Sequence, residues 1–354
     1  TVPIFESKLS EYVNAKYAVA TNSGTSALHI ACIALGLDCG DYLWTTPISF
    51  VASANCGLYC GAKVDFVDID RNTWNIDVDK LSKKLESAKK ANKLPSVIVI
   101  VHFSGLSCDM EEIKSLSIKY KFRVIEDASH ALGGRYKNNQ IGSCLYSDIA
   151  TFSFHPVKSI TTGEGGMATT NDKPLADKMR LLRSHGIKRD INRGNNKSPL
   201  WYYEQNCLGF NYRMTDIQAA LGISQLKKID NFVRKRNQIS AKYHDLLSHM
   251  DIKLPYRNEN YYSAQHLFVI RIKLDQVSRK HQEVFNYLRE HNIGVNLHYI
   301  PIYRQPFYNS MGYKEVDFPE SESYYSEAIT LPIFPGLKNE EIRYIASTIE
   351  KALK

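Results

Sequence analysis

Three short stretches of the chain combine side chains that catalysis commonly uses. Segment 152–171, FSFHPVKSITTGEGGMATTN, runs from an apolar stretch into Lys158 and then into a cluster of glycines. Burying an ammonium group is costly, and lysine side chains usually reach out to water. Lys158 is therefore either an ordinary loop residue or an amine that is needed uncharged for chemistry, and this segment alone leaves both interpretations open.

The second stretch is EDASHALG at 126–133, which places Asp127 at the end of an expected strand and His130 three residues later. A carboxylate in that position suits a buried hydrogen-bonded group, a metal ligand, or the partner of a protonated ring nitrogen. Because the chain has no HExxH or HxH motif, we expect no metal site. His130 is equally compatible with a histidine of the core.

The third stretch is NSGTSAL at 22–28, where Ser23, Thr25 and Ser26 surround Gly24 at the expected start of a helix. Free backbone N–H groups, hydroxyls and the helix dipole together bind phosphate well. The same residue types also serve simply as helix caps. Taken alone, this segment leaves phosphate binding and capping open.

Taken together, the three loops meet the needs of one cofactor, pyridoxal phosphate. Its phosphate needs a hydroxyl-rich helix start, its pyridine nitrogen a carboxylate, and its aldehyde a lysine. Glycines after Lys158 would let the chain turn close beside the ring. No GxGxxG follows the first strand pattern, which argues against a nicotinamide-dependent oxidoreductase.

Strand and helix patterns alternate through the first two thirds of the chain, and this alternation must position the three loops. The expected helices are 22–37, 75–93, 109–121 (with Asp109 and Glu112 at capping-box spacing) and one that begins near Pro174. The expected strands are 62–70, 96–105, 122–134, 147–155 and 165–172. This order predicts an α/β fold with a mostly parallel sheet between helices, and ligands bind at the carboxyl ends of such strands.

The pattern changes from Thr215 onward, where Thr215 and Gln218 have capping-box spacing and one long helix is expected to about Ser248. Further expected elements are strands 265–274 and 294–299, a helix at 281–293 and a terminal helix from Lys338. These elements predict a smaller C-terminal α+β domain. We place the division inside the long helix, with a large domain at 1–226 and a small domain at 227–354.

Composition and charge exclude several classes of protein. The chain has 44% hydrophobic and 23% charged residues and a net charge of +8, without a basic patch joined to a nucleic-acid-reading motif. No apolar run reaches the length of a membrane span, and TVPIFESKL at the start is not a basic-then-apolar leader. Seven scattered cysteines show no CxxC or zinc spacing. We expect a cytoplasmic protein that binds neither membranes nor nucleic acid.

Seven motifs carry a resemblance to a known family. They are TNSGTSAL, TTPISFVASAN, IEDASHALG, FSFHPVKSITTGEGG, LRSHGI, GFNYRMTDIQAALG and HYIPIY. In this order they resemble the fold-type-I, pyridoxal-phosphate-dependent sugar-nucleotide aminotransferases over essentially the whole chain. The resemblance implies a three-layer sandwich like that of aspartate aminotransferase. Family members with histidine in place of the lysine are sugar dehydratases, so Lys158 implies transamination.

The resemblance also implies a role for each matching residue. Lys158 would hold the cofactor and move protons, Asp127 would pair with the pyridine nitrogen, and His130 would lie near the phenolic oxygen. The phosphate would contact Gly24, Thr25, Ser26 and Ser153 of one subunit and Asn211 of the other subunit of an obligate homodimer. Phe50 would stack on the ring, although packing in the core is the alternative for this residue.

The sugar nucleotide and the amino donor are less well defined. His298 and Tyr299 of HYIPIY are the expected sugar-nucleotide contacts, with Arg189, Arg193 and Tyr303 as further candidates. The family normally has a short segment before TVPIFE that helps to shape the substrate side. Glutamate is the donor that the resemblance implies. Its carboxylates need a cation, and no motif identifies that cation.

Two segments indicate the branch of the family. FHPVKSITTGEGG and WYYEQNCLGFNYRMTDIQAALG most resemble the branch that aminates UDP-4-keto-6-deoxy-N-acetyl-β-L-altrosamine in pseudaminic acid biosynthesis. The alternative substrates are other 4-keto-6-deoxy nucleotide sugars, of the UDP-N-acetylbacillosamine, viosamine or perosamine type. A non-catalytic regulator that retained the fold is the alternative of another class, but it would be expected to lose Lys158 or Asp127.

Overall fold

A seven-stranded sheet forms the centre of the computed structural model, which describes residues 1–189, 192–193, 196–197, 199 and 201–354. The strand order is β1-β9-β8-β5-β4-β2-β3. The pairs β2–β3, β2–β4, β4–β5 and β5–β8 are parallel, whereas β9 runs antiparallel to β8 and β1. The strands are β1 Tyr17–Thr21, β2 Tyr42–Thr45, β3 Lys63–Phe66, β4 Val97–Val101, β5 Arg123–Asp127, β8 Ile149–Ser153 and β9 Gly166–Thr170. The mostly parallel sheet predicted from the sequence is confirmed.

Strand β4 shows why the sheet needs helices on both faces. All five of its residues, VIVIV, are buried. Val97 and Val99 belong to one apolar cluster, with residues of α2 Gly24–Ala34, α3 Ala52–Tyr59 and α6 Lys173–Leu182. Ile98 and Ile100 belong to another, with residues of α4 Val78–Lys90 and α5 Met110–Tyr120. Because successive strand residues point to opposite faces, an unbroken apolar run requires a cover on each side.

Side-chain caps explain the starts of some of the helices. Ser23, Asp77 and Asp172 accept hydrogen bonds from the first turns of α2, α4 and α6. The capping box predicted for Asp109 and Glu112 is wrong, because Asp109 makes no cap hydrogen bond. Its carboxylate instead accepts a hydrogen bond of 2.7 Å from the Tyr136 hydroxyl.

The predicted helix 215–248 is two helices, α7 Asp216–Leu226 and α8 Ile229–Leu247. The capping box of Thr215 and Gln218 is confirmed at the start of α7. This helix packs on α1 Val2–Val13, where a side chain at Gly222 would collide with Phe5. The break falls at 227–228, beside our predicted domain division at 226/227, which stays a prediction.

The C-terminal part is built on a three-stranded antiparallel sheet of β14 Ile252–Lys253, β16 Phe268–Ile272 and β17 Ala328–Leu331. Its apolar cluster includes residues of α8, α9 His281–Glu290 and α12 Asn339–Leu353. The strand predicted at 294–299 is wrong, since only Asn296 forms a bridge, to Thr330. The Asn296 side chain accepts from the next backbone N–H, at 2.8 Å, and such local bonds compete with a ladder.

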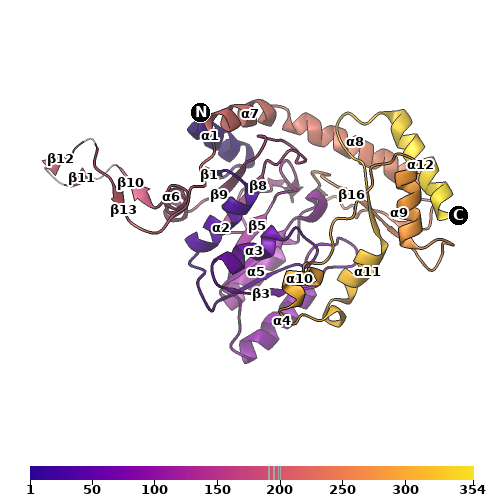
Figure 1. The fold of residues 1–354 in the computed structure, drawn as a ribbon, viewed down its shortest axis with the longest axis horizontal. Helices are drawn as coiled ribbons and strands as arrows, with labels where there is room; N and C mark the ends of the chain where they lie inside the picture. The colour runs from indigo at the N-terminus through magenta and orange to yellow at the C-terminus, as the bar shows by residue number, and fades with distance from the viewer. Residues whose placement is uncertain (190–191, 194–195, 198, 200) are drawn as a thin grey trace.

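The remaining elements are short. They are β6 Arg135–Tyr136, β7 Asn139–Gln140, β10 Ile187–Lys188, β11 Asn192–Arg193, β12 Asn196–Lys197, β13 Glu204–Gln205, β15 Tyr261–Tyr262, α10 Pro306–Asn309, α11 Pro319–Glu327 and the 3₁₀ turns η1 Phe103–Gly105, η2 Ile302–Arg304 and η3 Glu315–Asp317. Figure 1 shows β10–β13 on an arm that extends away from the central sheet. Across the described residues, we find no helix with the length and apolarity of a membrane span.

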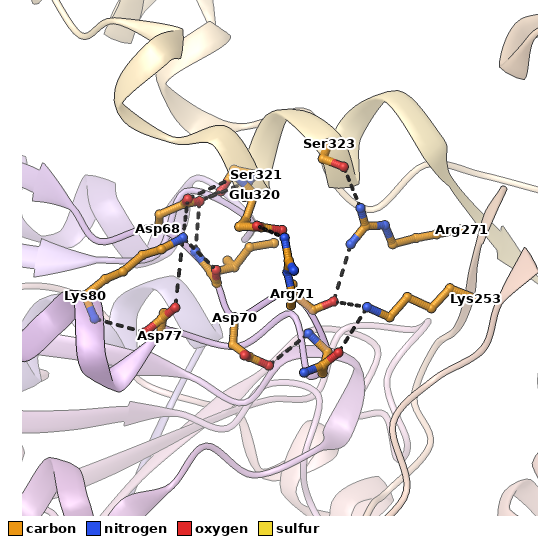
Figure 2. Close-up of polar contacts among 12 residues, drawn as sticks. Asp68, Asp70, Arg71, Asp77, Lys80, Lys253, Arg271, Glu320, Ser321 and Ser323 are labelled. Carbon is orange, nitrogen blue, oxygen red and sulfur yellow. Dashed lines mark hydrogen bonds and ion pairs between the residues drawn. The ribbon is translucent and has the colours of Figure 1, made fainter. Parts of the chain in front are cut away.

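A buried polar network joins the turn after β3 to helix α11, which leads directly into β17 (Figure 2). The Asp68 carboxylate accepts hydrogen bonds from the backbone N–H groups of Glu320 and Ser321, at 3.1 and 2.9 Å, and so caps α11 from outside. It also pairs with the Lys80 ammonium at 2.8 Å. The Arg71 and Glu320 side chains form a more exposed ion pair beside it. Asp68 therefore ties together two distant parts of the chain.

Replacing Asp68 with asparagine is expected to lower the free energy of unfolding by about 2 kcal/mol, because a buried charged acceptor loses several of its partners. Chemical denaturation monitored by circular dichroism measures this. The matched control is Asp65→Asn. Asp65 pairs with Lys84 at the surface, and its loss should cost less than about 1 kcal/mol. Equal stabilities for the Asp68 variant and the wild type would contradict the capping role.

Candidate active site

The three loops singled out in the sequence meet around one cavity of about 270 Å³. They come from the start of α2 and from the ends of β5 and β8, where neighbouring strands present the same edge of the sheet. The lining residues are Ser23, Gly24, Thr25, Leu28, Ser49, Phe50, Ala52, Val101, Asp127, Ser129, His130, Ser153, His155, Val157, Lys158, Glu164 and Tyr299. Most of the residues predicted for the site therefore line a single space.

The start of α2 forms one corner of this cavity. Ser23 is the N-cap, and its hydroxyl accepts from the Ser26 N–H at 3.1 Å. A Cβ atom on Gly24 would lie 2.9 Å from Ser153 Cβ, so glycine is what lets the helix start approach the end of β8. The first N–H groups of a helix have no intrahelical acceptor. With the hydroxyls of Thr25 and Ser153, they offer an anion a set of converging donors.

Ser26 differs from its predicted place. It is not among the residues that line the cavity, and its hydroxyl donates to the Asn22 side chain at 2.6 Å. The side chain thus stabilises the turn that leads into α2. Contact between Ser26 and a bound phosphate remains a prediction.

Asp127 lies at the end of β5 with a carboxylate held at both oxygens. Oδ2 accepts from the Ser53 hydroxyl at 2.7 Å, and Oδ1 accepts from the Ser129 backbone N–H at 3.1 Å. Ser53 in turn shares a hydrogen bond of 2.8 Å with Ser49. We did not single out Ser49 or Ser53 from the sequence. The sequence could have indicated them, because Ser49 and Ser53 are two hydroxyl residues four positions apart within the segment TTPISFVASAN.

Lys158 follows β8 in a turn and is partly buried. Burial lowers the pKa of its ammonium from 10.5 to about 8, while the negative charge of Asp127 acts in the opposite direction. A substantial fraction of this amine is therefore uncharged near pH 8. This property distinguishes Lys158 from a solvated loop lysine and suits an amine that transfers protons.

Three histidines lie near Lys158. The His130 ring lies 4.4 Å from the His266 ring, and His130 Nε2 is 3.2 Å from the Tyr299 hydroxyl. Burial, followed by the charge of Lys158, lowers the pKa of His130 and His266 well below 6.5, and that of His298 to about 4. All three rings are therefore neutral near pH 7. His266 has no motif around it in the sequence, so only the fold reveals it.

Phe50 is 58% exposed, and it lines the cavity. Packing in the core, the alternative interpretation for this residue, is therefore wrong. An aromatic face at the cavity wall is available for a planar ring to stack on. That stacking remains a prediction.

Some predicted residues lie elsewhere. Asn211 is exposed and does not line the cavity of its own chain, and its expected place is across a dimer interface. Tyr303 is wrong as a nucleotide contact, because it is buried in the core and donates to Glu322 at 2.6 Å. Arg189 is exposed next to β10, and the side chain of Arg193 lies outside the described part of the chain.

The chemistry of these groups fits pyridoxal phosphate. A helix start with hydroxyls suits the phosphate, the fixed carboxylate of Asp127 suits a protonated ring nitrogen, and Lys158 offers an amine with a lowered pKa. His130 Nδ1 is buried and has no hydrogen-bond partner among the described residues. A ligand oxygen beside that ring would satisfy it.

Comparison with known proteins supports the same chemistry. Residues 1–350 match the profile of the DegT/DnrJ/EryC1/StrS aminotransferase family. The chain is 38% identical over 351 residues to a UDP-4-amino-4,6-dideoxy-N-acetyl-beta-L-altrosamine transaminase of Campylobacter jejuni, which covers 99% of this chain and 89% of the relative. It is 33% identical over 347 residues to a GDP-perosamine synthase of Escherichia coli O157:H7, covering 98% and 88%.

A solved structure is similar over the same length. PseC of Helicobacter pylori, described as an aminotransferase involved in the biosynthesis of pseudoaminic acid, superposes with a TM-score of 0.90. The two chains are 31% identical, and the match covers 99% of this chain and 91% of the other. The likeness therefore extends from the central sheet through the C-terminal part.

Proposed function

The chain belongs to the DegT/DnrJ/EryC1/StrS aminotransferase family and is a pyridoxal-phosphate-dependent sugar aminotransferase, and on this premise we propose that it aminates UDP-4-keto-6-deoxy-N-acetyl-β-L-altrosamine with glutamate as the donor. The product would serve pseudaminic acid biosynthesis. The proposal is carried by the 38% identity to the altrosamine transaminase over 99% of the chain. The likeness to PseC agrees with it.

The cavity suggests what each side chain contributes. Bound pyridoxal phosphate supplies an aldehyde that carries the amino group and a ring that accepts electron density. Lys158, with its lowered pKa, would take the proton from the reacting carbon of glutamate and later deliver a proton to C4 of the sugar. The face from which Lys158 protonates C4 would set the configuration of the new amine.

The other residues would hold and orient the cofactor. Asp127, fixed by Ser53 and Ser129, would keep a negative charge opposite the ring nitrogen. Thr25, Ser153 and the start of α2 would bind the phosphate. Asn211 of a second copy would complete that phosphate site, so we propose that the enzyme works as a homodimer.

A second substrate class has its own support. The relative named GDP-perosamine synthase is 33% identical over 98% of the chain, so a 4-keto-6-deoxy sugar of another configuration is the alternative. Both candidates share the lysine, the carboxylate and the phosphate site. They differ in the sugar and in the nucleotide base, and His298 and Tyr299 are the residues expected to contact the sugar nucleotide.

Turnover of two UDP-4-keto sugars, of L-arabino and D-xylo configuration, separates the altrosamine assignment from the UDP-N-acetylbacillosamine-type alternative. We expect the L-arabino ketone to be converted at least about tenfold more efficiently, a difference of about 1.4 kcal/mol in the barrier. NMR of the products identifies the configuration at C4. A clear preference for the D-xylo ketone would remove the pseudaminic acid assignment and leave the family assignment in place.

A further inference from the structure

Four of the seven cysteines, which are scattered in the sequence, meet on two neighbouring helices, α2 and α3, which pack against each other (Figure 1). Cys32 lies in the last turn of α2, Cys56 lies on α3, and Cys60 is the C-cap of α3. Cys39 lies close by, since a Cβ atom on Gly61 would be 3.6 Å from its sulfur. All four are free thiols, and they form a group outside the cavity that holds Lys158.

The thiol of Cys32 connects this group. It is fully buried and lies within hydrogen-bonding reach of both Cys56 and Cys60. Cys56 is also fully buried, and its thiol donates to the Ser53 carbonyl at 3.3 Å. Cys60 is only partly buried. Of these three thiols, Cys60 is therefore the one that a small reagent in water can reach.

An imidazole completes the surroundings of Cys60. His29 lies one turn before Cys32 on α2, and its ring hydrogen-bonds to the Cys60 thiol. The position of the ring is fixed from the other side, because Nδ1 lies 3.2 Å from the Tyr212 hydroxyl. The Tyr59 ring packs on it as well, at 5.3 Å between centroids. Cys60 thus has two hydrogen-bonding neighbours, a thiol and an imidazole.

These neighbours favour the thiolate form of Cys60. The hydrogen bond from Cys32 is the largest cause that lowers the pKa of the Cys60 thiol below its usual range. Burial opposes this shift, the hydrogen bond and charge of His29 add to it, and the negative charge of Asp38 opposes it. A thiolate, rather than a thiol, is the nucleophile in cysteine chemistry.

Two kinds of chemistry use several thiols beside a histidine. One is metal binding, but among the described residues no group of three or more His, Cys, Asp or Glu side chains is arranged to hold a metal ion. The other is oxidation, for which the usual arrangement is an accessible thiolate with a second thiol in contact. Cys60 and Cys32 meet both of these requirements.

We propose that Cys60 is a site of reversible oxidation by hydroperoxides, and that Cys32 is the thiol that resolves it. The Cys60 thiolate attacks one oxygen of hydrogen peroxide, the O–O bond breaks, and hydroxide leaves, which gives a sulfenic acid. The Cys32 sulfur then bonds to the Cys60 sulfur while the S–O bond breaks, and its proton leaves with the hydroxyl group as water. The two cysteines lose two electrons, which the peroxide accepts, and a thiol reductant returns them.

The disulfide would join the two helices whose other ends help to form the cavity. Helix α2 begins at Gly24, in the corner expected to bind phosphate, and α3 carries Ser53, which donates to Asp127. The inference does not depend on the proposed transamination, because it uses only the thiols and their neighbours. Its test therefore needs no substrate.

Peptide mapping of the wild-type holoenzyme tests the site directly. The reduced protein is treated with limiting hydrogen peroxide near neutral pH, alkylated, digested without reductant and examined by mass spectrometry. We expect a peptide pair joined between Cys32 and Cys60, which dithiothreitol separates. Cys39 and Cys207 are the exposed cysteines, so they would react first if exposure alone set the rate. We expect Cys60 to be oxidised at least about twofold faster than either.

Three variants separate the roles of the thiols. In Cys32→Ser the resolving thiol is absent, while serine keeps a donor beside Cys60, so the sulfenic acid should accumulate and be trapped by dimedone. Cys60→Ser should form no disulfide at Cys32. Cys39→Ser is the matched control, and it should form the bond between Cys32 and Cys60 at the rate of the wild type.

Several results would overturn the proposal. They are oxidation of Cys39 or Cys207 before Cys60, a disulfide that joins Cys39 to Cys60, and absence of a dimedone adduct at Cys60 in Cys32→Ser. The mapping of the wild type decides even if a substitution at the buried Cys32 prevents folding. Failure of the keto sugar or of glutamate to react would contradict the proposed function and leave this site unaffected.

Discussion

Replacing Lys158 with alanine is expected to lower turnover by about 10³-fold or more and to abolish covalent retention of the cofactor. The amine is the only lysine nitrogen among the described lining residues of the cavity, and burial brings its pKa to about 8. Alanine leaves no group there to move a proton at the reacting carbon, and such transfer contributes about 10²- to 10⁴-fold. Turnover of the keto sugar, followed by product NMR, measures the loss.

A second readout separates chemistry from folding. After borohydride reduction, mass spectrometry should find the cofactor attached at Lys158 in the wild type and no attachment in the variant. Lys173→Ala is the matched control, since Lys173 is exposed and pairs with Asp177 on α6. If Lys158→Ala keeps wild-type turnover, the assignment of this lysine is wrong.

The edge of the sheet where the loops meet could be predicted because one regularity governs it. Apolar runs such as β4 indicate a sheet covered on both faces, and parallel strands bring their carboxyl ends together. The loops that contain Asp127 and Lys158 were therefore expected to be neighbours, because strands were predicted before both of them; the strand before Gly24, β1, was not predicted. This rule applies to loops that are far apart in the sequence as well as to close ones.

Other parts of the site could not be predicted, because they depend on packing between distant segments. Ser53 was not expected to orient Asp127, since the contact spans 74 positions in the sequence. The place of His266 beside His130 is likewise set by the fold, and no local pattern encodes it. The prediction of a strand at 294–299 was wrong, because the Asn296 side chain accepts a local hydrogen bond from the Leu297 N–H, which competes with the hydrogen bonds of a strand.

Replacing Asp127 with asparagine is expected to lower turnover by about 10²- to 10³-fold with little change in shape, as for loss of one preorganised electrostatic group. Asparagine can keep one acceptor for Ser53 or Ser129 but loses the negative charge that would face the ring nitrogen. The rate of the glutamate half-reaction, measured from the visible absorbance of the bound cofactor, reports this loss directly.

The neighbouring strand residue provides a matched control for Asp127→Asn. Glu126 points to the opposite face of β5, where its carboxylate contacts His102 Nε2 at 2.8 Å. Glu126→Gln should therefore lower the unfolding temperature while leaving the half-reaction rate within about threefold of the wild type. Ser53→Ala removes one hydrogen bond to Asp127 and keeps its charge, so its rate should fall between those of the wild type and Asp127→Asn. Equal rates for Asp127→Asn and Glu126→Gln would show that the charge at Asp127 has no part in the reaction.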